Sequence, residues 1–216
     1  MATGSNSTPP ARRGSWYQRL FAAAMASENE RDEESYGGRK HALLADLHGD
    51  ILEIGPGAGP NLAYYSRDIR WHGLEPNPAM LPYIQREAER LGLSIDLREG
   101  RAEQLDAPDG SFDAVVGTLV MCSVRDPQRT LREILRVLKP GGRYVFIEHV
   151  AAPRKSVSRR IQGIVKPIWK LVSDGCEVDR ETGATIQAAG FSSVQIEDFR
   201  VETPIVAQHI AGYAVK

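Results

Sequence analysis

Residues 50–60 read DILEIGPGAGP, an apolar run closed by a glycine-rich turn near the middle of the first half of this 216-residue chain. A short apolar run that ends in such a turn is typical of a buried parallel strand. Pro60 favours the first position of a helix, where its missing N–H is harmless. The stretch therefore predicts a strand, a tight turn and a helix, with glycines that let a ligand approach the backbone.

Outward from this stretch, strand-like and helical patterns alternate along the chain. The strands are predicted at 69–74, 94–98, 112–117 and 143–150, and the helices at 78–91 and 127–138. Alternation of this kind indicates parallel strands joined by right-handed helical crossovers. Two later strand candidates, 193–200 and 205–215, favour an antiparallel pair at the sheet edge. The sequence predicts a three-layer α/β sandwich.

The composition excludes several classes of protein. The 27 basic and 28 acidic residues leave a net charge of −1, which argues against a general nucleic-acid binder. No apolar run reaches the roughly 18 residues that a membrane-spanning helix needs. Cys122 and Cys176 are the two cysteines, and without a CxxC spacing they argue against a disulfide framework and a structural zinc site. We therefore predict no metal.

The spacing of the glycines distinguishes between nucleotide cofactors. A dinucleotide fingerprint would place its third glycine where Pro60 stands. Here the order is Glu53-x-Gly55-x-Gly57-x-Gly59, and the leading acid suits a cationic amino-acid moiety better than a pyrophosphate. Glu75 closes the next predicted strand, where a carboxylate can bind both hydroxyls of a ribose. These features favour S-adenosylmethionine over a dinucleotide.

Four stretches carry a family resemblance: ILEIGPGAGPN, GLEPNPAM, GRAEQLDAPDGSFDAVVGTLVMCSV and LREILRVLKPGGRYVFIEHV. Together they resemble the successive motifs of class I S-adenosylmethionine-dependent methyltransferases. The segments 118–124, 148–152, 173–176 and 212–216 resemble more closely the alkyl thiol methyltransferases of animals. Those relatives begin with a hydrophobic anchoring segment, whereas this chain begins with a polar tail, so we expect no permanent membrane anchor. The resemblance implies a Rossmann-like fold with a mostly parallel seven-stranded sheet and an antiparallel C-terminal hairpin.

The resemblance also implies which residues surround S-adenosylmethionine. The methionine part would lie among Glu53, Gly55, Gly57 and Gly59. The ribose would be held by Glu75 and flanked by Asn77. The adenine would be bordered by Ala102 and Glu103, and the sulfonium by Thr118 and Leu119.

One methyltransferase domain is expected over residues 15–216, after a tail of Ser, Thr, Pro and Gly at 1–14 that we expect to be disordered. Within the domain we expect an N-terminal helical cap at 15–49, a cofactor-binding core at 50–150, a lid insert at 151–190 and a closing hairpin at 191–216.

Methyl transfer from a sulfonium requires alignment more than base catalysis, because the donor is already activated. A thiol with a pKa of about 8.5 is a few per cent thiolate at neutral pH. Two catalytic candidates follow. His149, at the end of a predicted strand, would take the acceptor proton or orient the acceptor, or else tie the strand end to a helix. Asp174, in the insert after that strand, is the second candidate for removing the acceptor proton, or else caps a loop or helix. Cys176 is interpreted as a small buried residue, since direct transfer needs no covalent intermediate.

The insert carries six basic residues and no acid between 151 and 173. Its apolar residues, which include Ile161, Ile164 and Ile168, recur at helical spacing. This pattern predicts a lid whose apolar stripe packs over the site, with peripheral membrane contact as the alternative. Such an entrance suggests a small hydrophobic acceptor, and we expect a thiol sulfur. The alternatives are a quinone carbon, a phenolic oxygen, a lipid amine, or a catalytically silent cofactor-binding protein. We expect a monomer or weak homodimer in the cytoplasm, with an organelle or a membrane surface as the alternative location.

Overall fold

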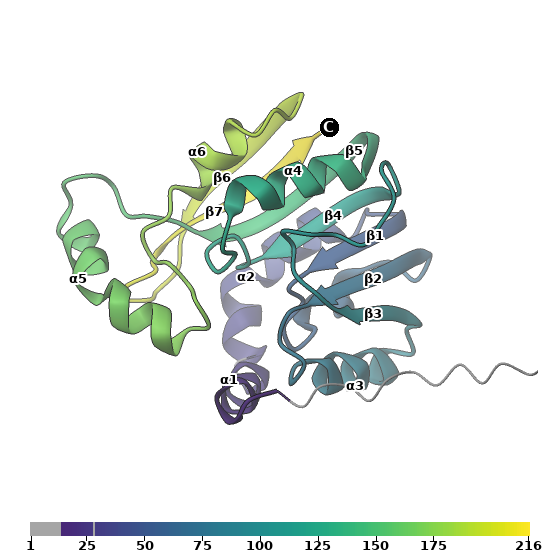
Figure 1. Ribbon diagram of the computed structural model, residues 1–216, viewed down its shortest axis with the longest axis horizontal. Helices are drawn as coiled ribbons and strands as arrows, with labels where there is room; N and C mark the ends of the chain where they lie inside the picture. Colours follow the sequence, from purple (N-terminus) through teal and green to yellow (C-terminus); the bar gives the residue numbers. More distant parts are fainter. Residues whose placement is uncertain (1–13, 28) are drawn as a thin grey trace, which may run out of the picture.

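The computed structural model describes residues 14–27 and 29–216, so the tail expected at 1–14 lies outside the described residues except for Gly14. Seven strands form one sheet in the order β3-β2-β1-β4-β5-β7-β6 (Figure 1). Strands β1 to β5 pair in parallel, β7 is antiparallel to β5, and β6 is antiparallel to β7. The strands are β1 (Gly49–Ile54), β2 (Ile69–Glu75), β3 (Ile95–Glu99), β4 (Phe112–Thr118), β5 (Leu138–His149), β6 (Ser193–Arg200) and β7 (Gln208–Val215). The predicted mixed sheet is confirmed.

Helices cover both faces of this sheet and complete the predicted three layers (Figure 1). One face packs against α1 (Trp16–Ala26), α2 (Asn29–Leu44), the 3-10 helix η1 (Pro60–Tyr64) and α3 (Leu81–Leu91). The other face packs against α4 (Pro127–Val137) and α6 (Thr182–Gln187). Adjacent residues of β1 face opposite sides of the sheet. Ile51 packs in the apolar cluster under α1, α2, η1 and α3, and Leu52 packs in the cluster under α4 and α6.

The structure refines several elements of the sequence expectation. The helical cap expected at 15–49 contains α2, which begins at Asn29 in a mostly polar stretch that gives no periodic signal. The helix predicted at Pro60 is a short 3-10 turn. Strand β5 begins at Leu138 rather than Arg143, and its pairing with β4 shifts register within the Pro-Gly-Gly segment.

Helix α5 (Val157–Val172) stands off beyond the carboxyl ends of β4 and β5 (Figure 1). The expectation that its apolar stripe packs over the site is wrong. Ile164 is 77% exposed and Ile168 is 70% exposed, whereas Gln162 is the buried residue of this helix. The side-chain amide of Gln162 connects α5 to two other segments. It accepts a hydrogen bond from the backbone N–H of Ala152 and donates one to the carbonyl of Ile205.

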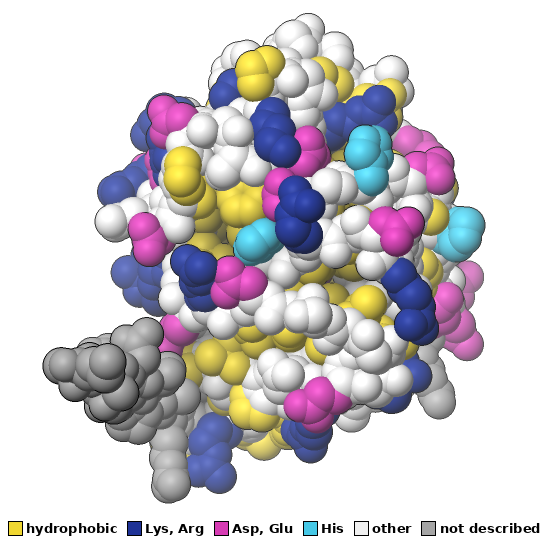
Figure 2. All heavy atoms as spheres, turned by 90° about the vertical axis from the view of Figure 1, so that its right-hand side faces the viewer, with side chains coloured by type: hydrophobic (Ala, Val, Ile, Leu, Met, Phe, Trp, Pro, Cys, Tyr) yellow, Lys and Arg dark blue, Asp and Glu magenta, His cyan; other side chains and the backbone are white. Residues whose placement is uncertain are grey.

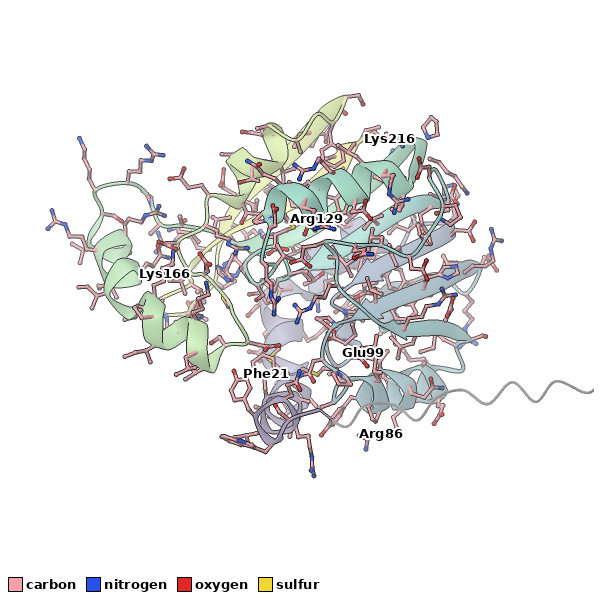
Figure 3. All side chains as sticks on the ribbon, viewed as in Figure 1. Phe21, Arg86, Glu99, Arg129, Lys166 and Lys216 are labelled. Carbon is pink, nitrogen blue, oxygen red and sulfur yellow. The ribbon has the colours of Figure 1, made fainter. Side chains whose placement is uncertain are left out.

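Basic side chains of the acid-free stretch at 151–173 face acids that follow this stretch in sequence. Lys166, labelled in Figure 3, lies 2.9 Å from Asp179, and Lys170 lies 2.8 Å from Glu177. Arg154 pairs with Glu181 at 2.9 Å. Part of the positive charge of the acid-free stretch is therefore paired with acids of the segment that follows it. Contact of this surface with a membrane stays a prediction.

The edge opposite α5 carries the amino ends of the parallel strands. Figure 2 shows that positive and negative side chains are interspersed on this face. Arg70 lies 2.6 Å from Asp50, and Lys139 lies 2.7 Å from Asp113, so neighbouring strands are joined by ion pairs. Within the described residues, no helix combines the length and the apolar character needed to cross a membrane.

Candidate active site

The turn after β1 contains three glycines with left-handed backbone angles. The φ angles of Gly55, Gly57 and Gly59 are 60°, 60° and 88°. A Cβ on Gly55 would lie 2.9 Å from Cγ2 of Val120, so packing requires a glycine there. A Cβ on Gly57 would meet no atom of the described residues within 4 Å, its chain neighbours aside. Gly57 therefore borders open space into which a side chain would project and which a ligand can occupy.

Glu75, the last residue of β2, is held by two backbone donors. The N–H of Gly57 donates to Oε2 at 3.1 Å, and the N–H of Asn77 donates to Oε1 at 2.8 Å. Burial raises the pKa of Glu75 to about 7, although both backbone hydrogen bonds favour the ion. Each carboxylate oxygen retains an acceptor site for a further donor.

Asn77 joins this carboxylate to the N-terminal helix. Its Oδ1 accepts from the N–H of Ala79 at 3.0 Å, and its Nδ2 donates to the carbonyl of Gln18 at 3.2 Å. Helix α1 is thus fixed next to the ends of β1 and β2.

Glu53 is buried and surrounded by donors from the protein itself. Its Oε2 accepts from Tyr65 at 2.8 Å and from the indole of Trp71 at 3.0 Å, while its Oε1 accepts from Asn61 at 2.9 Å. Burial raises the pKa of Glu53, and the three hydrogen bonds oppose that shift. Glu53 therefore first organises the end of β1 and the segment after it.

Asn61 is a site residue that the sequence reasoning missed. Its Nδ2 also lies 2.9 Å from Oγ1 of Thr118 and so bridges the ends of β1 and β4. Its Oδ1 is buried and accepts no hydrogen bond from the described residues. A buried acceptor without a donor is costly, which marks this atom as a place for a ligand N–H group. The signal was present, since Asn61 ends the first of the motif stretches.

The other expected cofactor residues lie at the ends of neighbouring strands. Leu119 has a left-handed φ of 57°, and its N–H donates to the carbonyl of Ile147 at 2.8 Å. Such strain in a non-glycine residue costs on the order of 1–3 kcal/mol and clusters at functional sites. Ala102 is buried, and Oε1 of Glu103 accepts from the N–H of Arg125 at 2.7 Å.

The two catalytic candidates lie in different surroundings. His149 is buried, and its Nε2 lies 3.0 Å from Sγ of Cys176. Cys122 belongs to the same group, in which the three ligand atoms lie within 4.8 Å of one another. Asp174 is exposed in a left-handed turn, and its N–H donates to the hydroxyl of Tyr17 at 3.1 Å. The structure thus brings His149 to two cysteines rather than to Asp174.

Electrostatics differ sharply within this group. The neighbouring Cys122 and His149 lower the pKa of Cys176 to about 5. The pKa of Cys122 is raised well above its usual value by its contact with Cys176 and by burial. One thiol of the pair is therefore the preferred anion.

Glu148 is a second residue that the sequence reasoning missed. Its Oε1 accepts from the backbone N–H groups of Val120 and Met121 at 2.9 and 2.8 Å, which orders the loop after β4. Its Oε2 is buried without a hydrogen-bond partner among the described residues. Burial raises the pKa of Glu148 to about 7. The sequence offered one indication of this role, because Glu148 is a charged residue directly after an apolar strand run.

The glycine turn at the end of β1, the acid at the end of β2 and the antiparallel β7 define the class I S-adenosylmethionine-dependent methyltransferases. Comparison with known proteins agrees. Residues 52–146 match the family described as a methyltransferase domain. The chain is 36% identical to thiol S-methyltransferase TMT1A of Homo sapiens over 196 residues, which cover 85% of this chain and 80% of that protein. It is 35% identical to human thiol S-methyltransferase TMT1B over 218 residues, covering 94% and 86%.

The chain therefore belongs to the methyltransferase family that includes these thiol S-methyltransferases, and it is an S-adenosylmethionine-dependent methyltransferase. A solved structure supports the fold alone. Geranyl diphosphate methyltransferase in complex with SAM superposes with a TM-score of 0.70 at 15% identity, covering 90% of this chain and 89% of that one.

Proposed function

We propose that this chain transfers the methyl group of S-adenosylmethionine to the sulfur of a small hydrophobic thiol by direct in-line displacement. The observation that carries the proposal is the likeness to thiol S-methyltransferases, which reaches 35% identity over 94% of the chain. A similarity of this extent includes the segments on the acceptor side, such as those around His149 and Cys176, as well as the cofactor core.

The described residues fit the proposed cofactor. The open space at Gly57 admits a ligand against the backbone, and the two oxygens of Glu75 retain acceptor sites for a pair of ribose hydroxyls. The unpartnered Oδ1 of Asn61 suits the ammonium group of a methionine moiety. Thr118 ends the adjoining strand β4, and Leu119 follows it. In this proposal Ala102 and Glu103 border the adenine.

When bound, S-adenosylmethionine supplies a methyl group that is already activated as an electrophile. The protein has to hold the acceptor in line and exclude water, which can contribute several kcal/mol through orientation alone. A thiol ionises readily enough to need little base. In this proposal His149 receives or orients the acceptor proton through Nε2, and Asp174 lies at the entrance beside Tyr17.

The test is an acceptor panel with the purified chain. Radiolabelled S-adenosylmethionine is supplied with an alkyl thiol, a phenol, a quinol and a lipid amine in parallel. The proposal expects label in the thiol product. Preferential labelling of another acceptor would change the acceptor class. If S-adenosylhomocysteine raises the melting temperature but no acceptor is methylated, the chain is a cofactor-binding protein without this activity.

A further inference from the structure

The side-chain group formed by Cys122, His149 and Cys176 is chemically distinct from the cofactor residues. Cys122 follows β4, His149 is the last residue of β5, and Cys176 lies between α5 and α6. These three side chains are 2%, 5% and 8% exposed. Their sulfur and nitrogen atoms all lie within 4.8 Å of one another. Three soft donor atoms thus converge from segments that are far apart in sequence.

The backbone holds these segments together. The N–H of Glu177 donates to the carbonyl of Cys122 at 2.9 Å, so the residue after Cys176 is tied to the loop after β4. A guanidinium nitrogen of Arg180 donates to the carbonyl of Met121 at 2.5 Å. The convergence is therefore built into the fold rather than dependent on the side chains alone.

The polar atoms of the group have poor partners of their own. Sγ of Cys122 lies 3.3 Å from the carbonyl of Leu119 and 3.5 Å from Oγ of Ser123, which are weak contacts for a thiol. Nδ1 of His149 is buried without a hydrogen-bond partner among the described residues. The unpartnered carboxylate oxygen of neighbouring Glu148 is also buried, and Glu148 interacts electrostatically with both cysteines.

We infer that Cys122, His149 and Cys176 bind a thiophilic divalent cation, for which Zn²⁺ is the best chemical fit. Two thiolates and an imidazole are ligands that zinc prefers, and around a tetrahedral zinc their atoms stand about 3.5 to 3.8 Å apart. The observed Nε2 to Sγ separation is 3.0 Å, and the largest separation in the group is at most 4.8 Å. Changes of about 1 Å or less in each separation would bring the three atoms to that geometry.

The ligand count indicates what kind of site this is. Structural zinc sites use four protein ligands, whereas catalytic sites use three and keep one position open. In the described part of the chain, the group contains these three residues and no further Cys, His, Asp or Glu. It also adjoins Leu119, which the proposed function places near the sulfonium. The second half of the inference is that the open position takes the acceptor thiol, and it rests on the proposed function. Coordination would exchange a bound water for the thiol sulfur and release the thiol proton to solvent, so that His149, with Nε2 on the metal, would orient the acceptor rather than receive its proton.

Cobalt substitution tests the site without any measurement of methylation. The full-length chain is reduced, stripped of metal and titrated anaerobically with Co²⁺. We expect a near-ultraviolet thiolate-to-cobalt charge-transfer band and visible d–d bands that saturate at about one ion per chain and disappear on addition of Zn²⁺. His149→Asn should weaken Co²⁺ binding at least tenfold, whereas His48→Asn, at an exposed histidine, should leave it unchanged. Absence of the charge-transfer band in the wild-type chain overturns the inference.

A thiol count provides an independent measurement that requires no substitution. In the wild-type chain we expect two free thiols after denaturation, and Zn²⁺ should protect both from a thiol reagent in the native state. A disulfide between Cys122 and Cys176 in freshly purified chain, or no protection by Zn²⁺, contradicts the metal site.

The role of the open position is tested separately. An alkyl thiol should shift the charge-transfer band of the cobalt-loaded chain, and a phenol should not. Thiol methylation that survives complete removal of metal by a chelator would retain the proposed function and overturn the metal's part in it. A cobalt spectrum without thiol methylation would retain the metal site and overturn the proposed function.

Discussion

The backbone N–H of Gly57 donates to Oε2 of Glu75 over 3.1 Å, so the turn that ends β1 positions the carboxylate that ends β2. The N–H of Asn77 fixes the other oxygen of that carboxylate at 2.8 Å. The two strands are adjacent and parallel, which brings their carboxyl ends to one edge of the sheet. Turn and acid therefore form one unit, which we propose as the ribose site.

Replacing Glu75 by Gln should weaken binding of S-adenosylhomocysteine by an order of magnitude or more. Two ribose hydroxyls would lose a charged acceptor, and hydrogen bonds to charged groups contribute roughly 1.5–3 kcal/mol each. Titration calorimetry measures the change. The matched control is Glu99→Gln, because Glu99 is paired in register with Glu75 at the end of β3 but is exposed (Figure 3). Equal affinity of wild type and Glu75→Gln would show that Glu75 is not the ribose ligand.

Cofactor affinity should rise with pH across neutrality. Burial raises the pKa of Glu75 to about 7, and ribose hydroxyls that donate to it favour the ionised form. For such a pKa the ionised fraction rises from roughly a tenth at pH 6 to nine tenths at pH 8. We expect up to about a tenfold gain in affinity by calorimetry over this interval. Glu75→Gln should lose this dependence and Glu148→Gln should keep it. A dependence that persists in Glu75→Gln would assign it to another group.

Gly57→Ala should impair cofactor binding far more than folding. A methyl group at this position meets no atom within 4 Å in the described part of the chain and would project into the space that we assign to the cofactor. Gly92→Ala is a close control, since Gly92 at the end of α3 has a φ of 68° and also meets nothing within 4 Å. Both variants should lose about 1 kcal/mol of stability from the left-handed backbone. Only Gly57→Ala should reduce the affinity for S-adenosylhomocysteine. Equal affinities in the two variants would contradict the assignment of this space.

Local pattern predicted the sheet well because its strands are short, apolar and bounded by turn residues. The predicted strand at 193–200 coincides with β6, and the predicted strand at 112–117 ends one residue before β4. The expectation failed where tertiary contacts override local signal. The Pro-Gly-Gly segment predicts the end of a helix and a turn before the strand. In the structure β5 already begins at Leu138, because Leu138 pairs with Phe112 of β4 ahead of a register shift.

The site shows the same limit more clearly. Glycine spacing and strand ends were enough to locate Gly57 and Glu75, because both follow from the order of the strands. The partners of buried groups were not predictable. Cys122 and Cys176 have no local spacing motif, and their meeting with His149 depends on three chain segments that fold together. The apolar stripe of α5 was expected to pack over the site, but it is exposed. Periodicity shows that one face of a helix is apolar and does not show what covers that face.

The effect of Glu148→Gln on the free energy of unfolding should be more favourable above neutral pH than at acidic pH. Burial raises the pKa of Glu148 from 4.5 to about 7, so the folded state holds this proton more tightly than the unfolded state does. Stability is therefore lost as pH rises from about 4.5 through 7, as the unfolded chain ionises first. The Gln side chain does not titrate, and its oxygen can still accept from Val120 and Met121. Glu75, whose pKa is also about 7, contributes a similar pH dependence of stability. This contribution is the same in wild type and variant and cancels in their difference.

Thermal unfolding of wild type and Glu148→Gln at pH 5 and pH 8 measures this effect. The difference in melting temperature, variant minus wild type, should be several degrees more positive at pH 8 than at pH 5, as expected for a domain of this size. Tyr144→Phe is a useful comparison, since it removes another buried, unpartnered oxygen that does not ionise in this pH range. Its change in melting temperature should be the same at both pH values. A Glu148→Gln variant that loses the same stability at pH 5 and pH 8 would show that the carboxylate is charged in the folded state throughout.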